Sequence, residues 1–465
     1  ALYFDPGHVT AIEINKATVD ILTNKYADYF KHWVRDQRVS LINDEGRYYL
    51  TTTDRKFDII QLSGVDSYSG TAGLAHVFSE NYLYTEEALK LYLSRLNPDG
   101  ILCLMRLEYQ NPREMLRALT TAVSVLRRAG ISPPADHIAM LTQTNGLYTA
   151  MLVKKTPFLP SEVERLKQWT MAGTLFGVTA APHHNIGTNV YQQFLMLDNP
   201  QYENAFIKSC AYDIRPTNDN RPFFFRFSYW KHLVLEPQKK QVIAAPFMEY
   251  TIITLVLVIG IVSVFCVLLP LAFLSRRGLN VRHKSRFGLL FAAVGVGYMS
   301  IEIAFMQKFG LFLGHPNYSL SVVLAVLLFF SGLGALWSGK IVNLTGGLTR
   351  VSYICVFFII ADYLLLPSLY HSLMSLSFLV KVIIVAGMIF PVGFCMGMFV
   401  PAAIDKLKPA ASEFIPWAWG INGVFSVIAP IIAIAVSMTW GINVLLISAI
   451  PFYIAAGFAY PKSAD

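Results

Sequence analysis

Charged residues are scarce in this sequence. Only 15% of its 465 residues are Asp, Glu, Lys or Arg, whereas a soluble globular protein has about 25%. Hydrophobic residues make up 54% of the chain, and they are concentrated in its second half. Residues 1–240 have a mixed, globular composition, while residues 247–460 are almost continuously apolar. This distribution excludes an ordinary soluble protein and predicts a globular part followed by a membrane part.

Metal-binding motifs are lacking too. The five cysteines are widely spaced and form no Cys-x-x-Cys pair, and His183 and His184 are adjacent rather than one helical turn apart. We therefore predict no metal site.

The net charge of +8 comes from basic residues that are scattered or lie beside apolar segments. This placement indicates a membrane-topology signal rather than a nucleic-acid partner.

Strand and helix patterns alternate in the globular part. The predicted strands are residues 8–14, 38–44, 57–62 and 100–106, with a hairpin around Asn145-Gly146. Predicted helices cover residues 15–30, capped by Asn15, then 85–96, and a segment from about 112 that Gly130 closes. Ser161 and Glu164 predict a capping box for a further helix. The order predicts a doubly wound α/β sheet with antiparallel strands added at its end.

Acidic residues follow the first three predicted strands. Glu13 ends the first, Asp44 ends the second, and Asp66 lies in the loop after the third. Ligands of doubly wound sheets bind beyond the carboxyl ends of the strands, where a carboxylate suits a ribose diol. One such acid can be a solvated strand end. Three in successive loops favour a nucleoside site.

Four segments resemble spermidine synthase and its aminopropyltransferase relatives, which have a methyltransferase-like Rossmann fold. They are "VTAIEIN", "NDEGRYYL", "FDIIQL" with Asp66 after it, and "YLYTEEALKLYLSRLNPDGIL", within residues 8–155. The resemblance implies that Glu13 holds the ribose of S-adenosylmethionine or its decarboxylated form. It also implies that Asp44 and Glu45 approach the adenine and that Asp66 faces a diamine.

The sequence departs from that family at two places. The family's glycine-rich loop after the first strand is not found, so we expect the chain to be the C-terminal part of a longer protein. Ser63 stands where the family has an acid that helps deprotonate the attacking amine. A hydroxyl cannot act as a general base near neutral pH without a partner. Ser63 therefore argues against aminopropyl transfer, and we interpret it as a loss of that reaction.

The segment "YDIRPTNDNRPFFFRF", residues 212–227, is similar to a Pro-Thr-Asp-Asp-Arg-Pro-Phe signature of membrane-fused members of the same family. We predict that Asp219 and Arg221 pair and fix this segment against the sheet or the membrane surface. The alternative is a simple loop whose aromatic residues anchor it at the membrane interface.

Seven apolar segments are long enough to cross a bilayer: residues 248–274, 287–313, 318–339, 350–370, 377–402, 417–439 and 442–460. "GYMSIEIAFMQKFGLFLGHPNYSLSVVLAVLLFFSGLG" and "PWAWGINGVFSVIAP" are similar to membrane segments of the same fused proteins. We predict a synthase-like domain (1–156), an extension and linker (157–246) and a seven-helix membrane domain (247–465).

Basic residues predict the orientation in the membrane. The loop after the first span has five Lys or Arg residues, and later loops on that face add more, whereas the opposite loops "GHPN", "PSLYHSLMS" and "MTWGIN" have none. The basic face is therefore predicted to be cytoplasmic. Seven crossings then place the globular domain outside the cytoplasm, although Lys231, Lys239 and Lys240 favour the reverse.

Two carboxylates lie inside predicted spans. Glu302 is in the second and Asp362 in the fourth, where an unpaired charge is costly. They predict an ion or proton path, or a polar tie between helices. Small residues (Gly332, Gly334 and Gly393-x-x-x-Gly397) predict close helix packing instead.

Three functions follow from these patterns. The first is a membrane-anchored transferase-like enzyme that uses S-adenosylmethionine or its decarboxylated form. The second is a non-catalytic accessory or scaffold subunit, whose partners are other membrane subunits or the expected N-terminal segment. The third is a transporter coupled to the globular domain.

Overall fold

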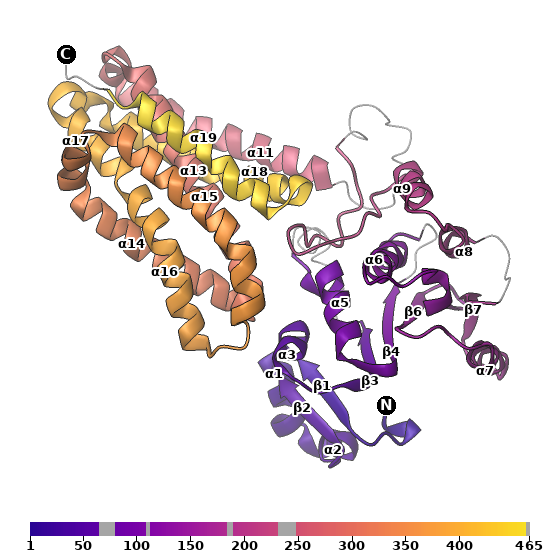
Figure 1. Ribbon diagram of the computed structural model, residues 1–465. Helices are drawn as coiled ribbons and strands as arrows, with labels where there is room; N and C mark the ends of the chain where they lie inside the picture. The colour runs from indigo at the N-terminus through magenta and orange to yellow at the C-terminus, as the bar shows by residue number, and fades with distance from the viewer. Residues whose placement is uncertain (65–79, 108–111, 184–188, 231–247, 462–465) are drawn as a thin grey trace. The chain divides into compact units, whose positions relative to one another are not determined.

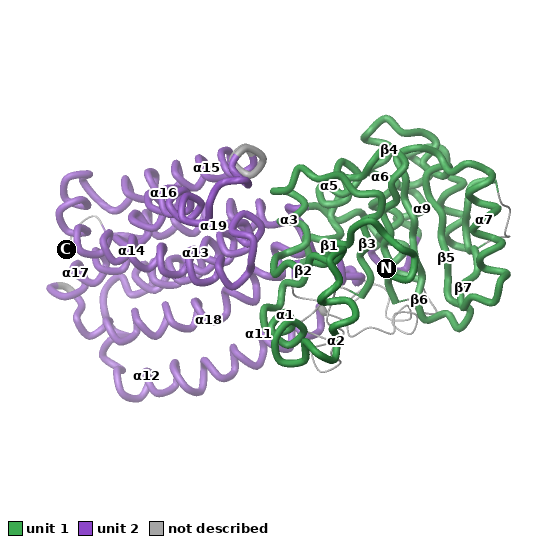
Figure 2. Tube along the Cα trace, turned by 90° about the horizontal axis from the view of Figure 1, so that it is seen from below, with its two compact units in different colours: residues 1–67, 81–209, 214–218 green, residues 68–80, 210–213, 219–465 purple. Residues whose placement is uncertain are grey.

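The computed structural model describes residues 1–64, 80–107, 112–183, 189–230 and 248–461. The chain divides into two compact units, coloured separately in Figure 2. The first contains residues 1–67, 81–209 and 214–218, and the second contains residues 68–80, 210–213 and 219–465. The first unit is α/β and the second is helical (Figure 1).

The strands of the first unit form two sheets. β1 (Val9–Glu13) pairs in parallel with β2 (Val39–Asn43), and the chain between them forms α1 (Lys16–Asp20), a π-helical turn (Ile21–Lys25) and α2 (Ala27–Val34). The second sheet has the order β3-β4-β6-β5-β7. Its strands are β3 (Phe57–Ser63), β4 (Leu96–Leu107), β5 (Ile138–Gln143), β6 (Tyr148–Lys154) and β7 (Phe176–Ala180).

The mixed sheet is consistent with a Rossmann-like spermidine synthase fold. β3 and β4 are parallel, while β5, β6 and β7 add antiparallel strands beside β4. The hairpin predicted around Asn145-Gly146 is confirmed, since β5 and β6 pair on either side of it. The predicted parallel strands are divided between the two sheets, so β1 and β3 each present an edge that pairs with no other strand among the described residues.

Six further α-helices belong to the described part of the first unit: α3 (Gly46–Thr52), α5 (Glu86–Arg95), α6 (Glu114–Arg128), α7 (Pro160–Met171), α8 (Val190–Leu195) and α9 (Pro200–Ser209). Of these, α5, α6, α7 and α8 contact the larger sheet. The Asn15 cap is confirmed, because its side chain accepts from the Ala17 amide at 2.9 Å. The Ser161–Glu164 capping box is wrong. α7 begins at Pro160, whose fixed φ suits the first helical position, and Glu162 instead accepts from the Leu159 amide at 2.8 Å.

Burial differs sharply along the first unit. Leu102 and Leu104 of β4 and Leu116 and Leu119 of α6 are completely buried. In contrast, β1, β2, α1 and α2 contain no buried residue. Parallel sheets are normally covered on both faces, so the β1–β2 layer leaves apolar surface uncovered. This layer borders the cavity described below.

The second unit contains the seven predicted membrane-crossing helices. Its elements are α11 (Met248–Ser263), a π-helical turn (Val264–Leu268), α12 (Leu269–Leu274), α13 (Lys284–Phe312), α14 (Pro316–Thr345), α15 (Leu348–Leu373), α16 (Phe378–Gly397), α17 (Phe399–Ala411), α18 (Ile415–Trp440) and α19 (Ile442–Ala459). Seven stretches are long and apolar enough to cross a membrane. α13 packs against α14, α18 and α19 (Figure 1).

Only two of the four glycines predicted to allow close packing lie against another helix's backbone. A Cβ on Gly334 of α14 would overlap the Phe394 carbonyl, and one on Gly397 of α16 would overlap the Ser331 carbonyl. A Cβ on Gly332 would meet open space. Gly393 has only ordinary contacts. The backbones of α14 and α16 therefore touch at Gly334 and Gly397.

Residues 214–227 of the predicted signature pass from the first unit to the second between positions 218 and 219. In the first unit, the Thr217 hydroxyl donates to the Tyr84 carbonyl at 2.8 Å. In the second, Asn220 accepts from the amides of Ile442 and Asn443, at 2.8 and 2.7 Å, where α19 begins. Arg226 donates to the Met438 carbonyl at 2.6 Å near the end of α18. The segment therefore satisfies backbone groups that helix ends leave unpaired.

Candidate functional site

A cavity of about 290 Å³ lies in the first unit, where β1 and β3 face one another. Its lining comes from β1, from the turn between β2 and α3, and from the edge of β3, with Leu83 and Tyr92 closing it. Most of the wall is apolar, including Ile12, Ile14 and Leu62. A flat aromatic group therefore finds apolar contacts there, next to a polar end.

Three of the predicted site carboxylates line this one cavity: Glu13, Asp44 and Glu45. The ends of β1 and β2 are held in register, because the Asn43 side-chain amide donates to the Glu13 carbonyl at 2.8 Å and the Ile14 carbonyl at 3.1 Å. The Asp44 amide also donates to the Glu13 carbonyl, at 3.2 Å. Paired strand ends thus bring together acids that lie 31 and 32 positions apart in the sequence.

The carboxylates are also engaged locally. One Glu13 oxygen accepts from the Asn15 amide at 2.7 Å. One Glu45 oxygen accepts from the Tyr48 amide at 2.6 Å and caps α3. Burial raises the pKa of Glu45, against the lowering effect of the hydrogen bonds from Tyr48 and Arg47. Glu45 is therefore both a helix cap and an acid that keeps its proton to a higher pH than an exposed glutamate.

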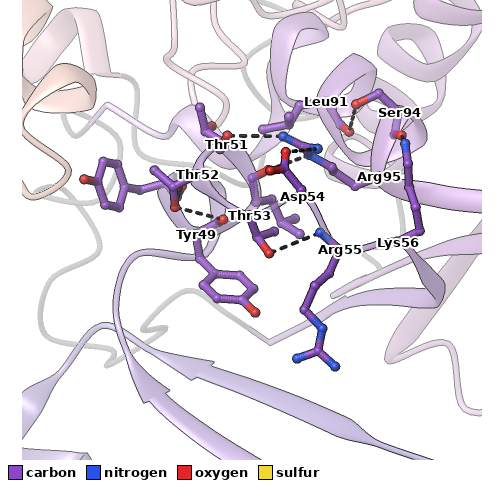
Figure 3. Close-up of polar contacts among 12 residues, drawn as sticks. Tyr49, Thr51, Thr52, Thr53, Asp54, Arg55, Lys56, Leu91, Ser94 and Arg95 are labelled. Carbon is purple, nitrogen blue, oxygen red and sulfur yellow. Dashed lines mark hydrogen bonds and ion pairs between the residues drawn. The ribbon is translucent and has the colours of Figure 1, made fainter. Parts of the chain in front are cut away.

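Helix α3 is fixed by contacts with α5, which Figure 3 shows at the C-terminal end of α3. Arg95 donates to the Leu50 carbonyl at 2.9 Å and to the Thr51 carbonyl at 3.2 Å, and it lies 3.6 Å from the Asp54 carboxylate. Lys56 donates to the Ser94 carbonyl (Figure 3). These contacts hold the helix that carries the cavity residues Tyr49 and Leu50.

The end of β3 holds Ser63, which we predict to stand where the family has an acid. The Ser63 hydroxyl accepts from the Gln61 side-chain amide at 3.1 Å. Gln61 lines the cavity, whereas Ser63 does not. In the part of the chain that the structure describes, no carboxylate or histidine bonds to Ser63. Asp66, predicted to face a diamine, lies outside the described residues.

Cys103 of β4 is paired in register with Gln61, and burial raises the pKa of its thiol to about 11. At pH 8 only about one thiol in a thousand is then ionised, and the thiolate is the reactive form. We expect Cys103 of the folded protein to resist iodoacetamide at pH 8 and to be alkylated once the chain is denatured. Peptide mass spectrometry measures both states, and rapid labelling of the folded protein would contradict the burial.

The other described residues that were predicted to be functional belong to the second unit and are not part of the cavity lining. Asp362 is 6% exposed, and its Oδ2 atom has no hydrogen-bond partner among the described residues. Glu302 is only partly buried. Arg221 lies 3.9 Å from the Asp213 carboxylate, a partner that the sequence did not predict. Its predicted pairing with Asp219 stays a prediction.

Sequence reasoning missed two polar contacts in the second unit. The Glu80 carboxyl accepts from the Gln307 side chain of α13 at 2.7 Å, and burial raises its pKa. Arg226 and Glu249 form an ion pair at 3.4 Å, with 4% and 0% of their side chains exposed. The only sequence feature that pointed to the Arg226–Glu249 pair was a glutamate at the start of an apolar span. No metal-binding cluster of His, Cys, Asp and Glu occurs among the residues that the structure describes.

Comparison with known protein families gives a match within the first part of the chain. The sequence model of the spermine/spermidine synthase domain matches residues 2–160. These residues include the cavity and its three carboxylates. A search of curated proteins finds no match to the chain.

Proposed function

Because residues 2–160 form a spermidine synthase-like domain followed by seven apolar helices, we propose that this is an integral membrane protein that binds an S-adenosylmethionine-type nucleoside. We further propose that it has lost aminopropyl transfer. The observation that carries the proposal is the convergence of Glu13, Asp44 and Glu45 on one cavity with apolar walls.

The cavity residues fit such a nucleoside chemically. A carboxylate at a strand end accepts hydrogen bonds from a ribose diol, and Glu13 has that position on β1. Asp44 and Glu45 provide acceptors for the adenine amino group. The apolar residues Ile12 and Leu62 suit the faces of the base. Decarboxylated S-adenosylmethionine is the donor that the spermidine synthase family uses, and it supplies the aminopropyl group.

The environment of Ser63 supports the loss of transfer. An attacking amine must lose a proton, and a general base has to accept it. The Ser63 hydroxyl accepts from the Gln61 amide, and that amide nitrogen cannot take a proton from it. Because Gln61 provides no basic group, Ser63 has no described neighbour that makes it a base. The protein would therefore bind the nucleoside without transferring its aminopropyl group.

Glu13→Gln is expected to weaken binding of methylthioadenosine about tenfold or more, because it removes a charged acceptor. Glu164→Gln, an exposed substitution on α7, is the matched control and should leave the affinity unchanged. Isothermal titration measures both. An unchanged affinity in Glu13→Gln would place the nucleoside elsewhere, and formation of spermidine from putrescine by the unaltered protein would contradict the loss of transfer.

A second candidate is a non-catalytic subunit of a membrane complex. It is favoured by the β1–β2 layer, which has no buried residue and presents unpaired strand edges. Another membrane subunit, or an N-terminal segment of a longer form of this protein, would cover that layer. Stoichiometric co-purification with protection of the β1 amides from hydrogen exchange supports this function. A monodisperse protein that binds nucleoside alone argues against it.

The charge distribution supports one orientation. The ends of α12 and α14 and the starts of α13 and α15 share a basic end of the helical unit, which we propose faces the cytoplasm. With seven crossings, the synthase-like domain would then lie outside the cytoplasm. Protease cleavage of this domain in intact cells tests the orientation, and full protection in intact cells with cleavage after lysis would reverse it.

A further inference from the structure

Five exposed basic residues surround the turn between α12 and α13. They are Arg276, Arg277, Arg282, Lys284 and Arg286, and we call them the basic turn. Residues 276–280 form a short 3-10 helix, and α13 begins at Lys284. The turn lies at the end of the helical unit where α19 ends, since Arg286 lies 3.4 Å from the Phe458 carbonyl.

The turn is held by Trp417 of α18 and by Glu413, which lies just before α18. The Trp417 indole donates to the Ser275 carbonyl at 2.9 Å. Gly278 packs so closely that a Cβ there would stand 2.5 Å from the Glu413 carbonyl oxygen and 2.7 Å from the Trp417 ring. The backbone that carries the basic side chains is therefore fixed, which reduces the entropy lost when a ligand binds.

The positive charge of the turn is not neutralised by carboxylates in the described part of the chain. Arg276 bonds to the Ala272 carbonyl, and Lys284 bonds to the Leu279 carbonyl. The side chains of Arg277 and Arg282 have neither a hydrogen bond nor an ion pair among the described residues. Two acids belong to the same end of the unit: Glu413, whose backbone lies against Gly278, forms no ion pair with the turn within the ranges that the structure describes, and Asp405 pairs with Lys408 at 3.0 Å. Exposed guanidinium groups are therefore available to bind an anion from outside the protein.

Other basic residues stand at the same end of the unit. Lys406 lies over the Tyr460 ring, just after α19. The Thr349 hydroxyl donates to the Gly457 carbonyl at 2.7 Å, which places neighbouring Arg350 there. This end is therefore broadly positive, and the basic turn is its densest part.

The apolar surface beside the basic turn indicates what kind of anion would bind there. Only 11% of the most apolar stretch of Glu249–Leu274 is buried inside the protein, so lipid tails must cover this helix. The segment Glu249–Leu274 ends with Phe273, 66% exposed, and Leu274, 86% exposed, and Leu274 is two residues before Arg276. A lipid whose tails lie along α11 and α12 thus has its headgroup at the level of the basic turn.

We propose that the basic turn binds the phosphate of an anionic phospholipid, with Arg277 and Arg282 as its principal ligands. The guanidinium group has a planar set of donors that matches phosphate oxygens. Juxtamembrane basic clusters attract anionic lipids for the same electrostatic reason. The acyl chains distinguish this partner from a free phosphate ion, because they contact Phe273 and Leu274.

Native mass spectrometry of the delipidated protein in neutral detergent tests this site. Added phosphatidylglycerol should remain bound, whereas phosphatidylcholine should be lost under the same conditions. Arg277→Gln/Arg282→Gln is expected to lower the apparent affinity for phosphatidylglycerol on the order of tenfold or more. Both side chains are exposed, so the variant should fold, and its circular dichroism should match that of the unaltered protein.

Arg55→Gln/Arg165→Gln removes the same charge from exposed positions in the first unit and should retain phosphatidylglycerol fully. Excess inorganic phosphate should not displace the lipid. Equal retention of phosphatidylglycerol by the turn variant and the unaltered protein would overturn the proposal. So would equal binding of phosphatidylcholine, or full displacement by phosphate.

Discussion

Replacing Arg226 by Met is expected to lower the free energy of unfolding of the helical unit by about 3–5 kcal/mol. Arg226 and Glu249 are almost completely buried, and Arg226 also donates to the Met438 carbonyl. Without the guanidinium, the Glu249 carboxylate keeps only the hydrogen bond that it accepts from the Ser228 hydroxyl, among the described residues. A buried charge without a counterion is costly, even where the intact pair adds little. Unfolding by sodium dodecyl sulfate in mixed micelles measures the change.

The double substitution Arg226→Met/Glu249→Met tests whether the loss of stability comes from the unpaired charge. It removes both charges, so it should recover a large part of the lost stability. Lys408→Gln breaks an exposed ion pair, in which the side chains are 63% and 58% exposed, and it should change stability by less than about 0.5 kcal/mol. A single Arg226→Met variant as stable as Lys408→Gln would show that the ion pair does not matter for the fold.

Gly397→Ala is the second change with a large expected effect, a loss of about 2–3 kcal/mol. The added methyl group would overlap the Ser331 carbonyl of α14. Gly334→Ala should be similarly destabilising, since its methyl group would overlap the Phe394 carbonyl of α16. In both cases the obstacle is helix backbone, which cannot move aside as a flexible side chain can. The same unfolding measurement applies.

Gly332→Ala is the matched control on the same helix. A Cβ at Gly332 meets open space, and alanine has a higher helix propensity than glycine. This substitution should therefore be neutral or slightly stabilising in the same assay. If Gly332→Ala and Gly334→Ala destabilised the helical unit equally, the backbone contact between α14 and α16 would be wrong.

The sequence predicted elements well where the pattern is local. Apolar length alone located the seven spans, and the Asn145-Gly146 turn located the β5–β6 hairpin. The capping box at Ser161 failed because the helix begins at Pro160, with Leu159 rather than Ser161 as its N-cap, two positions earlier. The glycine pattern also could not separate Gly332 from Gly334, because only the rotation of α14 decides which of them faces α16.

The site could be predicted only in part, because it depends on pairing between strands that are far apart in the sequence. The acids Glu13, Asp44 and Glu45 were identified from their places after strands, and they do line one cavity. That the cavity lies between two separate sheets depends on strand pairing, which no local pattern encodes. The contacts of Asn220 with α19 and of Arg226 with Glu249 join residues far apart in the sequence. The sequence of the signature segment alone does not show which residues of an apolar helix it contacts.

Calorimetric titration of the purified chain with a nucleoside tests the central claim most directly. Decarboxylated S-adenosylmethionine, S-adenosylmethionine and methylthioadenosine share the adenosine part that the cavity is proposed to bind. The account predicts saturable heat with at least one of them, and no conversion of the decarboxylated form when putrescine is present. Absence of binding for all three would contradict the nucleoside site, and turnover with putrescine would contradict the loss of aminopropyl transfer.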